Sequence, residues 1–365
     1  MKILIVNKLY HPWVGGVETI VKQLADGFAS HQNQIEVLVC TAKGKGGVEL
    51  EGGIKIVRAS SWGIFKSMPM SFSFFRLFKK MSAETDWIGL HHPFPLSFLA
   101  YFIFRPKAKL IIHYHSDIVR QKFFGFLLKP IIFWVLKRAQ HIVVSNPNMI
   151  NSSPILSKFS SQCRVVPFGV DIDRVDAMIN ADQVEKIKSQ YGEFILFVGR
   201  LNYYKGVSVL LDALKDCKKN LVIIGSGAEE INLKNQVKEL GIGERVFFIK
   251  NINDKELMNF YKAARVFVLP SLFKSETFGI VLLEAMACGT PVISTELGTG
   301  TSFINSNNAT GQVVPAGNST ELTQALNNIL NNSDKHDQYA RAARQRVQDF
   351  FTLDNMIRQN LKLLE

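Results

Sequence analysis

The sequence predicts an α/β fold with two doubly wound domains, each built around a parallel β-sheet. Its 365 residues exceed what one hydrophobic core usually supports, so two domains of ordinary size are expected. Short β-branched runs alternate with segments of helical periodicity, which is typical of right-handed β-α-β units. The alternation occurs twice and lapses once, between residues 167 and 194, where polar residues accumulate. We therefore place the domain boundary in this interval.

The first half of the chain predicts a domain of residues 1–170. Helical periodicity is clear in VETIVKQLADGFA (17–29) and FGFLLKPIIFWVLKRA (124–139). The strands are expected at KILIV (2–6), QIEVLVC (34–40), GIKIVRA (53–59), DWIGLHH (86–92), KLIIHYH (109–115), HIVVS (141–145) and CRVVPFG (163–169).

The second half repeats the scheme and predicts a domain of residues 171–345. Its strands are expected at EFILFVGR (193–200), NLVIIGSG (220–227), RVFFIK (245–250), RVFVLPS (265–271), PVIST (291–295) and GQVVP (311–315). Helices are expected at 207–216, 230–241, 254–264 and 278–288, and three more close the chain at 319–330, 337–351 and 353–364. Two such domains facing each other place the carboxyl ends of both sheets around one cleft, where doubly wound sheets bind ligands.

Cysteine usage and the N-terminus predict a cytoplasmic protein. The four cysteines are far apart and form no C-x-x-C pair, which argues against a disulfide framework and a structural zinc site. The start, MKILIVNKLY, passes quickly from apolar to polar residues and lacks a small-residue cleavage site, so it reads as a first strand. The cysteines are Cys40, Cys163, Cys217 and Cys288.

The net charge of +12 lies entirely in the first half. Residues 1–175 contain 22 Lys and Arg against 10 Asp and Glu, whereas the remainder contains 21 of each. Such asymmetry indicates an anionic partner for the first domain, either nucleic acid or a membrane surface.

Two segments of this half, 61–81 and 120–140, interleave aromatic and aliphatic residues with cations. Neither offers eighteen uninterrupted apolar residues, so neither is expected to span a bilayer. A basic amphipathic surface can rest on anionic lipid. We therefore expect these segments to bind the anionic inner face of the cytoplasmic membrane. In the alternative interpretation, their apolar residues belong to the core and their lysines are ordinary solvated surface charges. The cations are Lys66, Arg76, Lys79, Lys80, Arg120, Lys122, Lys129, Lys137 and Arg138.

Three glycine-containing loops after predicted strands are candidate phosphate sites. Gly15-Gly16 precedes a helix, and glycines there let a backbone approach an anion at the helix N-terminus; a tight turn is the alternative. Arg200 and Lys205 follow one strand, and two cations on such a loop could clamp a diphosphate. Gly225 and Gly227 form a weaker G-x-G signal.

The run SETFGIVLLEAMACGTP (275–291) places two glutamates, Glu276 and Glu284, at the ends of an apolar segment. An unpaired carboxylate there is costly to desolvate. The run resembles the E-x7-E motif of retaining glycosyltransferases of the GT-B architecture, in the large group called glycosyl transferases group 1, or family 4. Five further features lie in that family's order: Gly15-Gly16, HSD (115–117), PFGVD (167–171), Gly199-Arg200 with Lys205, and GSG (225–227).

The resemblance covers nearly the whole chain and implies roles for residues of the second domain. It implies two Rossmann-like domains facing each other across a cleft, with a C-terminal helix of residues 346–365 crossing back to the first. Glu284 would accept hydrogen bonds from the ribose hydroxyls, and Glu276 would reach the transferred sugar. The backbone around Phe278, Gly279 and Ile280 would contact phosphate or sugar, beside the glycine loops at Gly199 and Gly225. Arg200 and Lys205 would neutralise the leaving diphosphate, the main demand of transfer without a metal. Each carboxylate would be satisfied by hydroxyls or water.

Several histidines fall at strand ends in the first domain. The family's motif histidine matches His115, which would lie near the donor sugar and β-phosphate, while His113 fits a packed residue. Asp117 would orient His115 or contact the acceptor, and the sequence leaves both open. His11, which precedes the glycine loop, is an acceptor-side candidate. His91 and His92 also lie near loop ends, without an assigned role.

The resemblance implies a metal-independent hexosyltransferase that uses a nucleoside diphosphate sugar as co-substrate and no other cofactor. VDIDR (170–174) imitates the metal-binding D-x-D of another glycosyltransferase architecture, but it follows PFG at the domain crossing, so we reject it as a metal site. HSDIVRQK (115–122) and SNPNMINSSPIL (145–156) resemble members that assemble bacterial surface polysaccharides, which indicates GDP-mannose or a related donor and a lipid-linked glycan acceptor. The leaving phosphate is expected to take the acceptor proton on the same face.

Two other functions remain open from the sequence. A nucleotide-sugar 2-epimerase shares the two-domain architecture and would turn over the donor without an acceptor, although the ETFGIVLLE context favours transfer. A basic nucleic-acid-binding protein would need aromatic residues on an exposed base-stacking face. We prefer the enzyme and expect no nucleic-acid partner. The excess positive charge explains only the first half of the chain, whereas the motifs expected at the cleft come from both halves.

Overall fold

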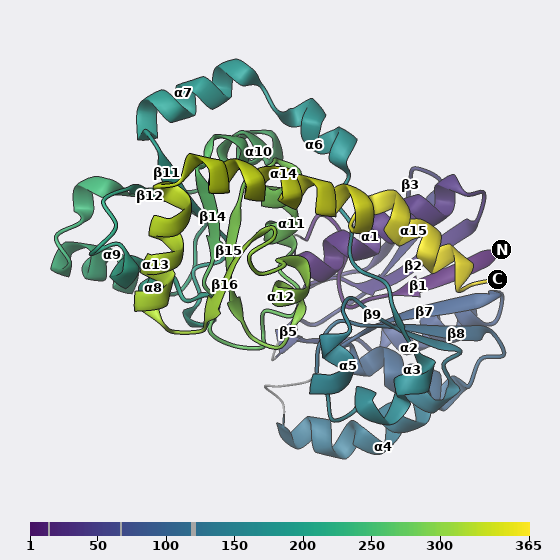
Figure 1. The fold of residues 1–365 in the computed structure, drawn as a ribbon. Helices are drawn as coiled ribbons and strands as arrows, with labels where there is room; N and C mark the ends of the chain where they lie inside the picture. Colours follow the sequence, from purple (N-terminus) through teal and green to yellow (C-terminus); the bar gives the residue numbers. More distant parts are fainter. Residues whose placement is uncertain (14, 66–67, 118–121) are drawn as a thin grey trace. The chain divides into compact units, whose positions relative to one another are not determined.

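The structure, a computed structural model, describes residues 1–13, 15–65, 68–117 and 122–365. It divides into two compact units (Figure 1). The first unit comprises Met1–Pro167 with Met356–Glu365, and the second comprises Phe168–Asn355. The division lies three residues before the expected boundary at residue 170.

The first unit contains an eight-stranded sheet in the order β10-β9-β8-β7-β1-β2-β4-β3. All neighbours are parallel except β3, which runs antiparallel to β4 at the edge. Its strands are β1 (Lys2–Val6), β2 (Gln34–Cys40), β3 (Gly47–Glu51), β4 (Ile54–Ala59), β7 (Trp87–His92), β8 (Lys109–Tyr114), β9 (His141–Val144) and β10 (Cys163–Val165). A separate two-stranded sheet pairs β5 (Ile64–Phe65) antiparallel with β6 (Met68–Pro69). All seven predicted strands are present, whereas β3 was not predicted because its five residues are all exposed and show no core-facing alternation.

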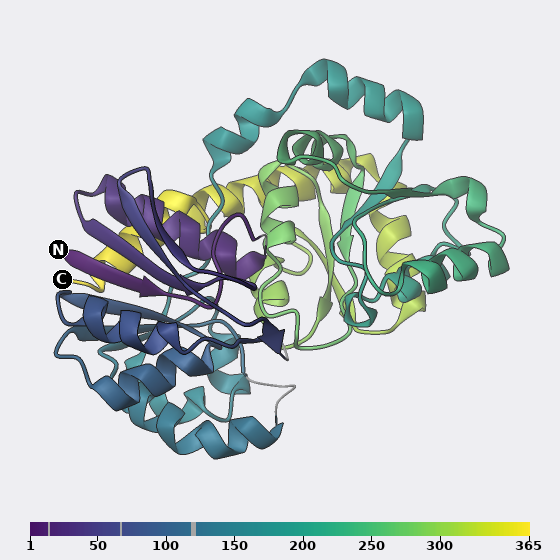
Figure 2. The same ribbon diagram turned by 180° about the vertical axis from the view of Figure 1, so that it is seen from behind.

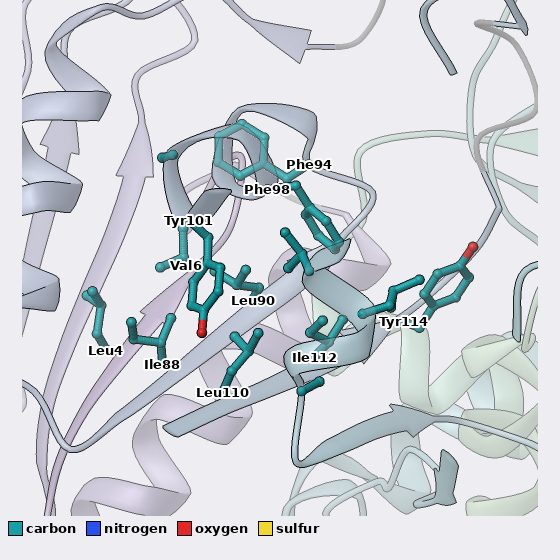
Figure 3. Packing of buried hydrophobic residues seen from close by; sticks show 14 of the residues in the cluster. Leu4, Val6, Ile88, Leu90, Phe94, Phe98, Tyr101, Leu110, Ile112 and Tyr114 are labelled. Atoms are coloured by element: carbon teal, nitrogen blue, oxygen red, sulfur yellow. The ribbon is translucent and has the colours of Figure 1, made fainter. Parts of the chain in front are cut away.

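Helices cover both faces of this sheet, with α1 on one and α2, α3 and α4 on the other (Figure 2). Alternate strand residues therefore face different layers: Leu90 and Ile112 pack against α2 to α4 in the cluster of Figure 3. The helices are α1 (Gly16–Ser30), α2 (Ser73–Ser82), α3 (Pro95–Phe104), α4 (Lys122–Arg138), α5 (Asn148–Ser152) and the 3-10 segment η1 (Leu156–Gln162).

The second unit is a six-stranded parallel sheet in the order β13-β12-β11-β14-β15-β16. The chain adds strands outward from β11 to one edge, then returns to β14 and continues to the other edge. The carboxyl ends of β11 and β14 therefore flank the switch point at which doubly wound sheets bind ligands. The strands are β11 (Phe194–Val198), β12 (Asn220–Ile224), β13 (Val246–Ile249), β14 (Val266–Leu269), β15 (Val292–Glu296) and β16 (Gly311–Pro315), as predicted.

Two hydrophobic clusters sandwich the second sheet. Helices α10, α11 and α14 pack on one face and α8, α9 and α13 on the other. The helices are α6 (Ile172–Met178), α7 (Ala181–Tyr191), α8 (Val207–Ala213), α9 (Glu230–Glu239), α10 (Asp254–Ala263), α11 (Ile280–Ala287), α12 (Gly300–Ile304), α13 (Ser319–Leu330) and α14 (Ser333–Phe350). Two 3-10 segments are η2 (Tyr203–Lys205) and η3 (Gly243–Arg245).

The chain end differs from the expected crossing helix of residues 346–365. Helix α14 continues to Phe350 within the second unit, and the backbone of Leu353 donates a hydrogen bond to Val170 there. Only from Met356, inside α15 (Leu353–Lys362), does the chain group with the first unit. Ile357 packs where Gly27 leaves room on α1, because a Cβ at Gly27 would lie 2.3 Å from its Cδ1.

All four cysteines are free, as their spacing predicted, and all four are also buried. Within the described part of the chain, no helix combines the length and the apolar character needed to cross a bilayer.

Candidate active site

A buried ion pair lies at the switch point of the second sheet. Lys205, at the end of η2 after β11, places its Nζ 2.5 Å from Oε2 of Glu276, which follows β14. Both residues are buried, and the Ser271 hydroxyl donates a second hydrogen bond to the same carboxylate oxygen over 3.2 Å. The expectation that Glu276 is satisfied by hydroxyls or water is thus wrong in part, because the ammonium of Lys205 is its nearest partner.

Backbone contacts bring these two loops together although 71 residues separate the pair. The amide of Leu272 donates to the carbonyl of Tyr204, so the segments after β11 and β14 run side by side. The Thr295 hydroxyl donates to the carbonyl of Ser271, which ties the same loop to β15. The positions of Lys205 and Glu276 are therefore set by the sheet and by its loops.

A pocket of about 280 Å³ opens at the carboxyl ends of β11 and β12. Its lining residue Gly199 lies near this pair, because a Cβ at Gly199 would be 3.7 Å from Nζ of Lys205. Gly199, Arg200 and Gly225 line it, together with Asn251. Arg200 is exposed, and among the residues that the structure describes it forms no ion pair. Gly225 has φ +142, and a Cβ there would lie 2.1 Å from the carbonyl oxygen of Gly199, so only glycine lets the two loops approach this closely.

Glu284 lies about one turn into α11 and accepts a hydrogen bond from the Tyr261 hydroxyl over 2.9 Å. Over the whole residue, Glu284 is half-buried. Burial raises the pKa of Glu284 to about 7, the Tyr261 hydrogen bond opposes this shift, and Asp254 adds to it. The pKa of Tyr261 is raised, first by burial and then by Glu284, so its hydroxyl remains a donor.

The start of α11 is shaped by a left-handed glycine. Gly279 has φ +90 at the N-cap, and Ile280 opens the helix. Phe278 is buried, and the Thr277 carbonyl accepts a hydrogen bond from the amide of Gly300. These contacts fix the backbone that follows Glu276, where an anion would meet the helix N-terminus.

In the first unit, the carboxyl ends of β7 and β8 carry four buried histidines. His91 Nδ1 lies 2.9 Å from His115 Nε2 in a hydrogen bond, and the His91 and His113 rings stack. His113 is thus packed, as expected. His92 stacks on Tyr114 across the strand pair.

Asp117 is held by hydroxyl donors. Its Oδ1 accepts hydrogen bonds from the Tyr114 hydroxyl over 2.5 Å and from the Ser153 hydroxyl over 2.8 Å. Burial raises the pKa of Tyr114, followed by the Asp117 charge, so this hydroxyl stays protonated. These contacts fix the start of the loop after β8.

The glycine loop of the first unit folds around a carboxylate. Gly15 is the N-cap of α1, Gly16 begins the helix, and a Cβ at Gly15 would lie 2.3 Å from Oε2 of the buried Glu18. His11 is exposed, and its carbonyl accepts a hydrogen bond from Arg58 over 2.5 Å.

Comparison with known proteins identifies the family. The family profile described as Glycosyl transferases group 1 matches residues 179–346, and that described as Glycosyltransferase Family 4 matches residues 14–174. The chain is 33% identical to O-antigen chain mannosyltransferase C of Escherichia coli, over 98% of this chain and 96% of that protein. The chain belongs to the group 1, family 4 glycosyltransferases.

A second relative supports the same family, and solved structures of similar fold support the architecture. D-rhamnosyltransferase WbpZ of Pseudomonas aeruginosa is 32% identical over 96% of this chain and 92% of that protein. Among solved structures, sucrose-phosphate synthase from Thermosynechococcus elongatus superposes with a TM-score of 0.82 at 22% identity, covering 99% of this chain and 98% of that one. Anabaena HepE in complex with UDP and glucose gives a TM-score of 0.78 at 20% identity, covering 100% and 99%. These structures show that the glycosyltransferase has the GT-B fold.

The D-x-D sequence of this glycosyltransferase, Asp171 to Asp173, lies at the start of helix α6. The Asp171 side chain accepts a hydrogen bond from the Arg174 amide and caps α6. Within the described ranges, no three His, Cys, Asp or Glu side chains are grouped so that they could hold a metal ion.

A basic and aromatic surface lies on the first unit of the glycosyltransferase. Along α2, Phe72 and Arg76 are exposed on the same face as Lys79 and Lys80, because they follow helical spacing. Trp62, before β5, is 74% exposed and meets the 71% exposed Phe72 edge-on at 5.1 Å. Lys66, Arg120 and the Lys122 side chain lie outside what the structure describes.

The second basic segment, on α4, combines exposed cations with rings. The Arg138 guanidinium lies 4.0 Å and that of Arg105 5.3 Å from the ring centroid of Trp134. The Lys129 ammonium lies 5.9 Å from the centroid of Phe133. From residue 87 to residue 170 the glycosyltransferase has ten Lys and Arg but only one acidic residue, Asp117. The segment of residues 87–170 is therefore strongly basic.

Proposed function

We propose that this glycosyltransferase transfers a mannosyl or closely related hexosyl group from a nucleoside diphosphate sugar, with GDP-mannose as the leading candidate. The acceptor is a hydroxyl of a lipid-linked glycan in bacterial surface polysaccharide assembly. The observation that carries the proposal is the buried Lys205–Glu276 pair at the switch point of the second sheet, beside the pocket lined by Arg200. Two relatives named as an O-antigen mannosyltransferase and a D-rhamnosyltransferase support the choice of sugar and product.

The donor binds to the second unit. Its nucleoside occupies the pocket at Gly199 and Gly225, and Glu284 accepts hydrogen bonds from the ribose hydroxyls. A carboxylate can receive two hydroxyl donors at once, which suits a vicinal diol. The diphosphate then meets Arg200 and the backbone at the start of α11. HepE, of similar fold, was solved with UDP and glucose, which supports a nucleotide sugar.

Charge stabilisation supplies most of the catalysis. When the bond from the anomeric carbon to the phosphate oxygen breaks, negative charge grows on the diphosphate, and Arg200 and Lys205 neutralise it. Glu276 holds Lys205 in place and reaches the transferred sugar. His115 contributes from the first unit, near the sugar and β-phosphate. The acceptor hydroxyl attacks on the face that the diphosphate leaves, its proton passes to a phosphate oxygen, and the anomeric configuration is retained without a metal ion.

The acceptor side belongs to the first unit. Asp117 and His11 are its candidate contacts. The basic and aromatic surface of α2 and α4 rests on an anionic membrane, with the Trp62 and Phe72 rings in the lipid interface and Arg76, Lys79 and Lys80 near the head groups.

The transfer proposal is tested with purified enzyme, labelled GDP-mannose, EDTA and a lipid-linked glycan acceptor. We expect a glycosylated lipid whose new linkage has the donor's anomeric configuration. An inverted linkage would overturn the mechanism, and loss of activity in EDTA would overturn metal independence. Donor turnover at full rate without any acceptor would favour an epimerase or hydrolase.

The membrane proposal is tested by co-sedimentation with vesicles of neutral lipid or of neutral lipid with 30% anionic lipid. We expect binding only to the anionic vesicles, with loss of roughly 1 kcal/mol per removed charge in Arg76→Ser, Lys79→Ser and Lys80→Ser. Lys234→Ser, which removes an exposed cation on α9 of the second unit, is the matched control. Equal binding of all variants would contradict the proposal.

A further inference from the structure

Three histidines of the first unit, His91, His113 and His115, form a buried cluster on one face of the eight-stranded sheet. The parallel register of β7 and β8 pairs His91 with His113, so these side chains leave the sheet on the same face. Their rings stack with centroids 4.6 Å and planes 5° apart. The ring of His115, two residues beyond His113, lies 5.1 Å from that of His91. His91 therefore contacts both other rings.

The hydrogen bond between His91 Nδ1 and His115 Nε2 couples the protonation of the two rings. A neutral imidazole has one donor and one acceptor nitrogen, and only one of the two facing nitrogens can carry the shared proton. If His91 donates from Nδ1, then His115 carries its proton on Nδ1; if His91 accepts, then His115 carries it on Nε2. The tautomer of one ring thus dictates that of the other.

The surroundings keep this cluster neutral. Burial lowers the pKa of His115 to about 3 and that of His113 to about 4. Burial also lowers the pKa of His91, and the adjacent His113 and His115 lower it further. The neighbouring His113, His92 and Lys8 lower the pKa of His115 further. Around neutral pH the three rings of the cluster are therefore neutral.

We propose that His91 is a positioning residue that fixes the tautomer and ring orientation of His115. The inference rests on the proposed function, in which His115 contacts the donor. Because Nε2 of His115 is engaged by His91, the protonation state of the His115 ring is coupled to that of His91. The flat stack against His113 keeps the His91 ring in the plane that this hydrogen bond requires.

Three variants separate the hydrogen bond from the packing. His91→Phe keeps an aromatic ring against His113 but removes the nitrogen that bonds to His115. His91→Asn restores an amide near the former Nδ1 position, and this amide can donate or accept. His113→Phe is the matched control, because it keeps an aromatic ring stacked on His91 and leaves both nitrogens of the His91–His115 hydrogen bond in place. A melting curve for each variant verifies that it is folded.

The direct measurement is the ¹⁵N chemical shift of the His115 ring nitrogens, recorded by long-range ¹H–¹⁵N NMR in ¹⁵N-histidine-labelled protein without substrate. The chain has eight histidines, and the His115→Gln spectrum assigns the signals of His115. We expect one protonated and one unprotonated nitrogen in the unmodified enzyme, in His91→Asn and in His113→Phe. In His91→Phe the two shifts should move toward each other or exchange. Unchanged shifts in His91→Phe would overturn the proposal.

Kinetics provide the second readout. His91→Phe should lower kcat by about 10- to 100-fold, by analogy with the loss seen when the hydrogen-bond partner of a metal-ligating histidine is removed, with the donor KM changed much less. His91→Asn should recover most of this loss, and His113→Phe should stay within a few-fold of the unmodified enzyme. Equal losses in all three variants would indicate packing and overturn the inference. Failure of the unmodified enzyme to use any nucleotide sugar would instead overturn the proposed function, while the NMR result would still report on His91.

Discussion

The pH dependence of donor binding gives a sharp test of the role proposed for Glu284. Burial raises its pKa to about 7, so near neutral pH about half of the enzyme carries the carboxyl group in its neutral form. The carboxylate accepts two hydroxyl hydrogen bonds, whereas the protonated group has lost part of this acceptor capacity. Donor affinity should therefore rise with pH through neutrality.

The magnitude follows from the fraction ionised. With a pKa of about 7, the carboxylate form decreases from roughly nine-tenths at pH 8 to roughly one-tenth at pH 6, so the donor Kd should increase about tenfold over this interval. The assay is isothermal titration calorimetry with GDP-mannose, or with the nucleotide sugar found to bind. The diphosphate diester of a nucleotide sugar has no proton that titrates in this range, so the ligand contributes no pH dependence of its own.

Two variants make the test specific. Glu284→Gln should bind the donor more weakly and with nearly the same Kd at pH 6 and pH 8. Tyr261→Phe removes the hydrogen bond that lowers the pKa of Glu284, so the midpoint should move to higher pH. A flat profile in the unmodified enzyme, or the same slope in Glu284→Gln, would refute the reasoning.

The remaining predictions concern the switch point of the second sheet. Lys205→Ala should lower kcat by about 100- to 1,000-fold with a small change in donor KM, as measured by steady-state kinetics, because a group that neutralises transition-state charge is lost. Glu276→Ala should lower the free energy of unfolding by about 3–5 kcal/mol in urea, because it leaves the buried Lys205 unpaired; a loss below 1 kcal/mol would contradict this. Gly225→Ala should lower the melting temperature and weaken donor binding, because its Cβ would meet the Gly199 carbonyl, whereas Gly243→Ala, with no atom within 4 Å, should do neither.

The strand pattern was predictable because buried parallel strands are continuous β-branched runs. All thirteen predicted strands are present, and the polar interval at 167–194 contains the division between the units at Pro167 and Phe168. The edge strand β3 could not be found in this way, because no residue of Gly47–Glu51 is buried. The late crossing of the chain, at Met356, depends on the packing of α15 and leaves no signal in composition.

The candidate site was predictable as a set of residues and not as a set of contacts. Lys205 and Glu276 were expected to act on different parts of the donor, and only the strand order brings them within 2.5 Å of each other. Ser271 and Tyr261 were missed, because a serine after a strand and a tyrosine on a helix carry no motif. The two-residue spacing of His113 and His115 indicated a shared strand face, but the hydrogen bond between His91 and His115 requires the register of β7 and β8.

The central claim, that the second unit binds a nucleoside diphosphate sugar without a metal, is tested most directly by thermal unfolding with UDP-, GDP- and ADP-sugars in EDTA. At a ligand concentration of about 100 Kd, binding adds about 2.7 kcal/mol, which corresponds to an increase of about 5–10 °C in the melting temperature of a unit of this size. We expect one base, with guanine as the leading candidate, to give this increase and Glu284→Ala to reduce it. If no nucleotide sugar changes the melting temperature, the claim is contradicted.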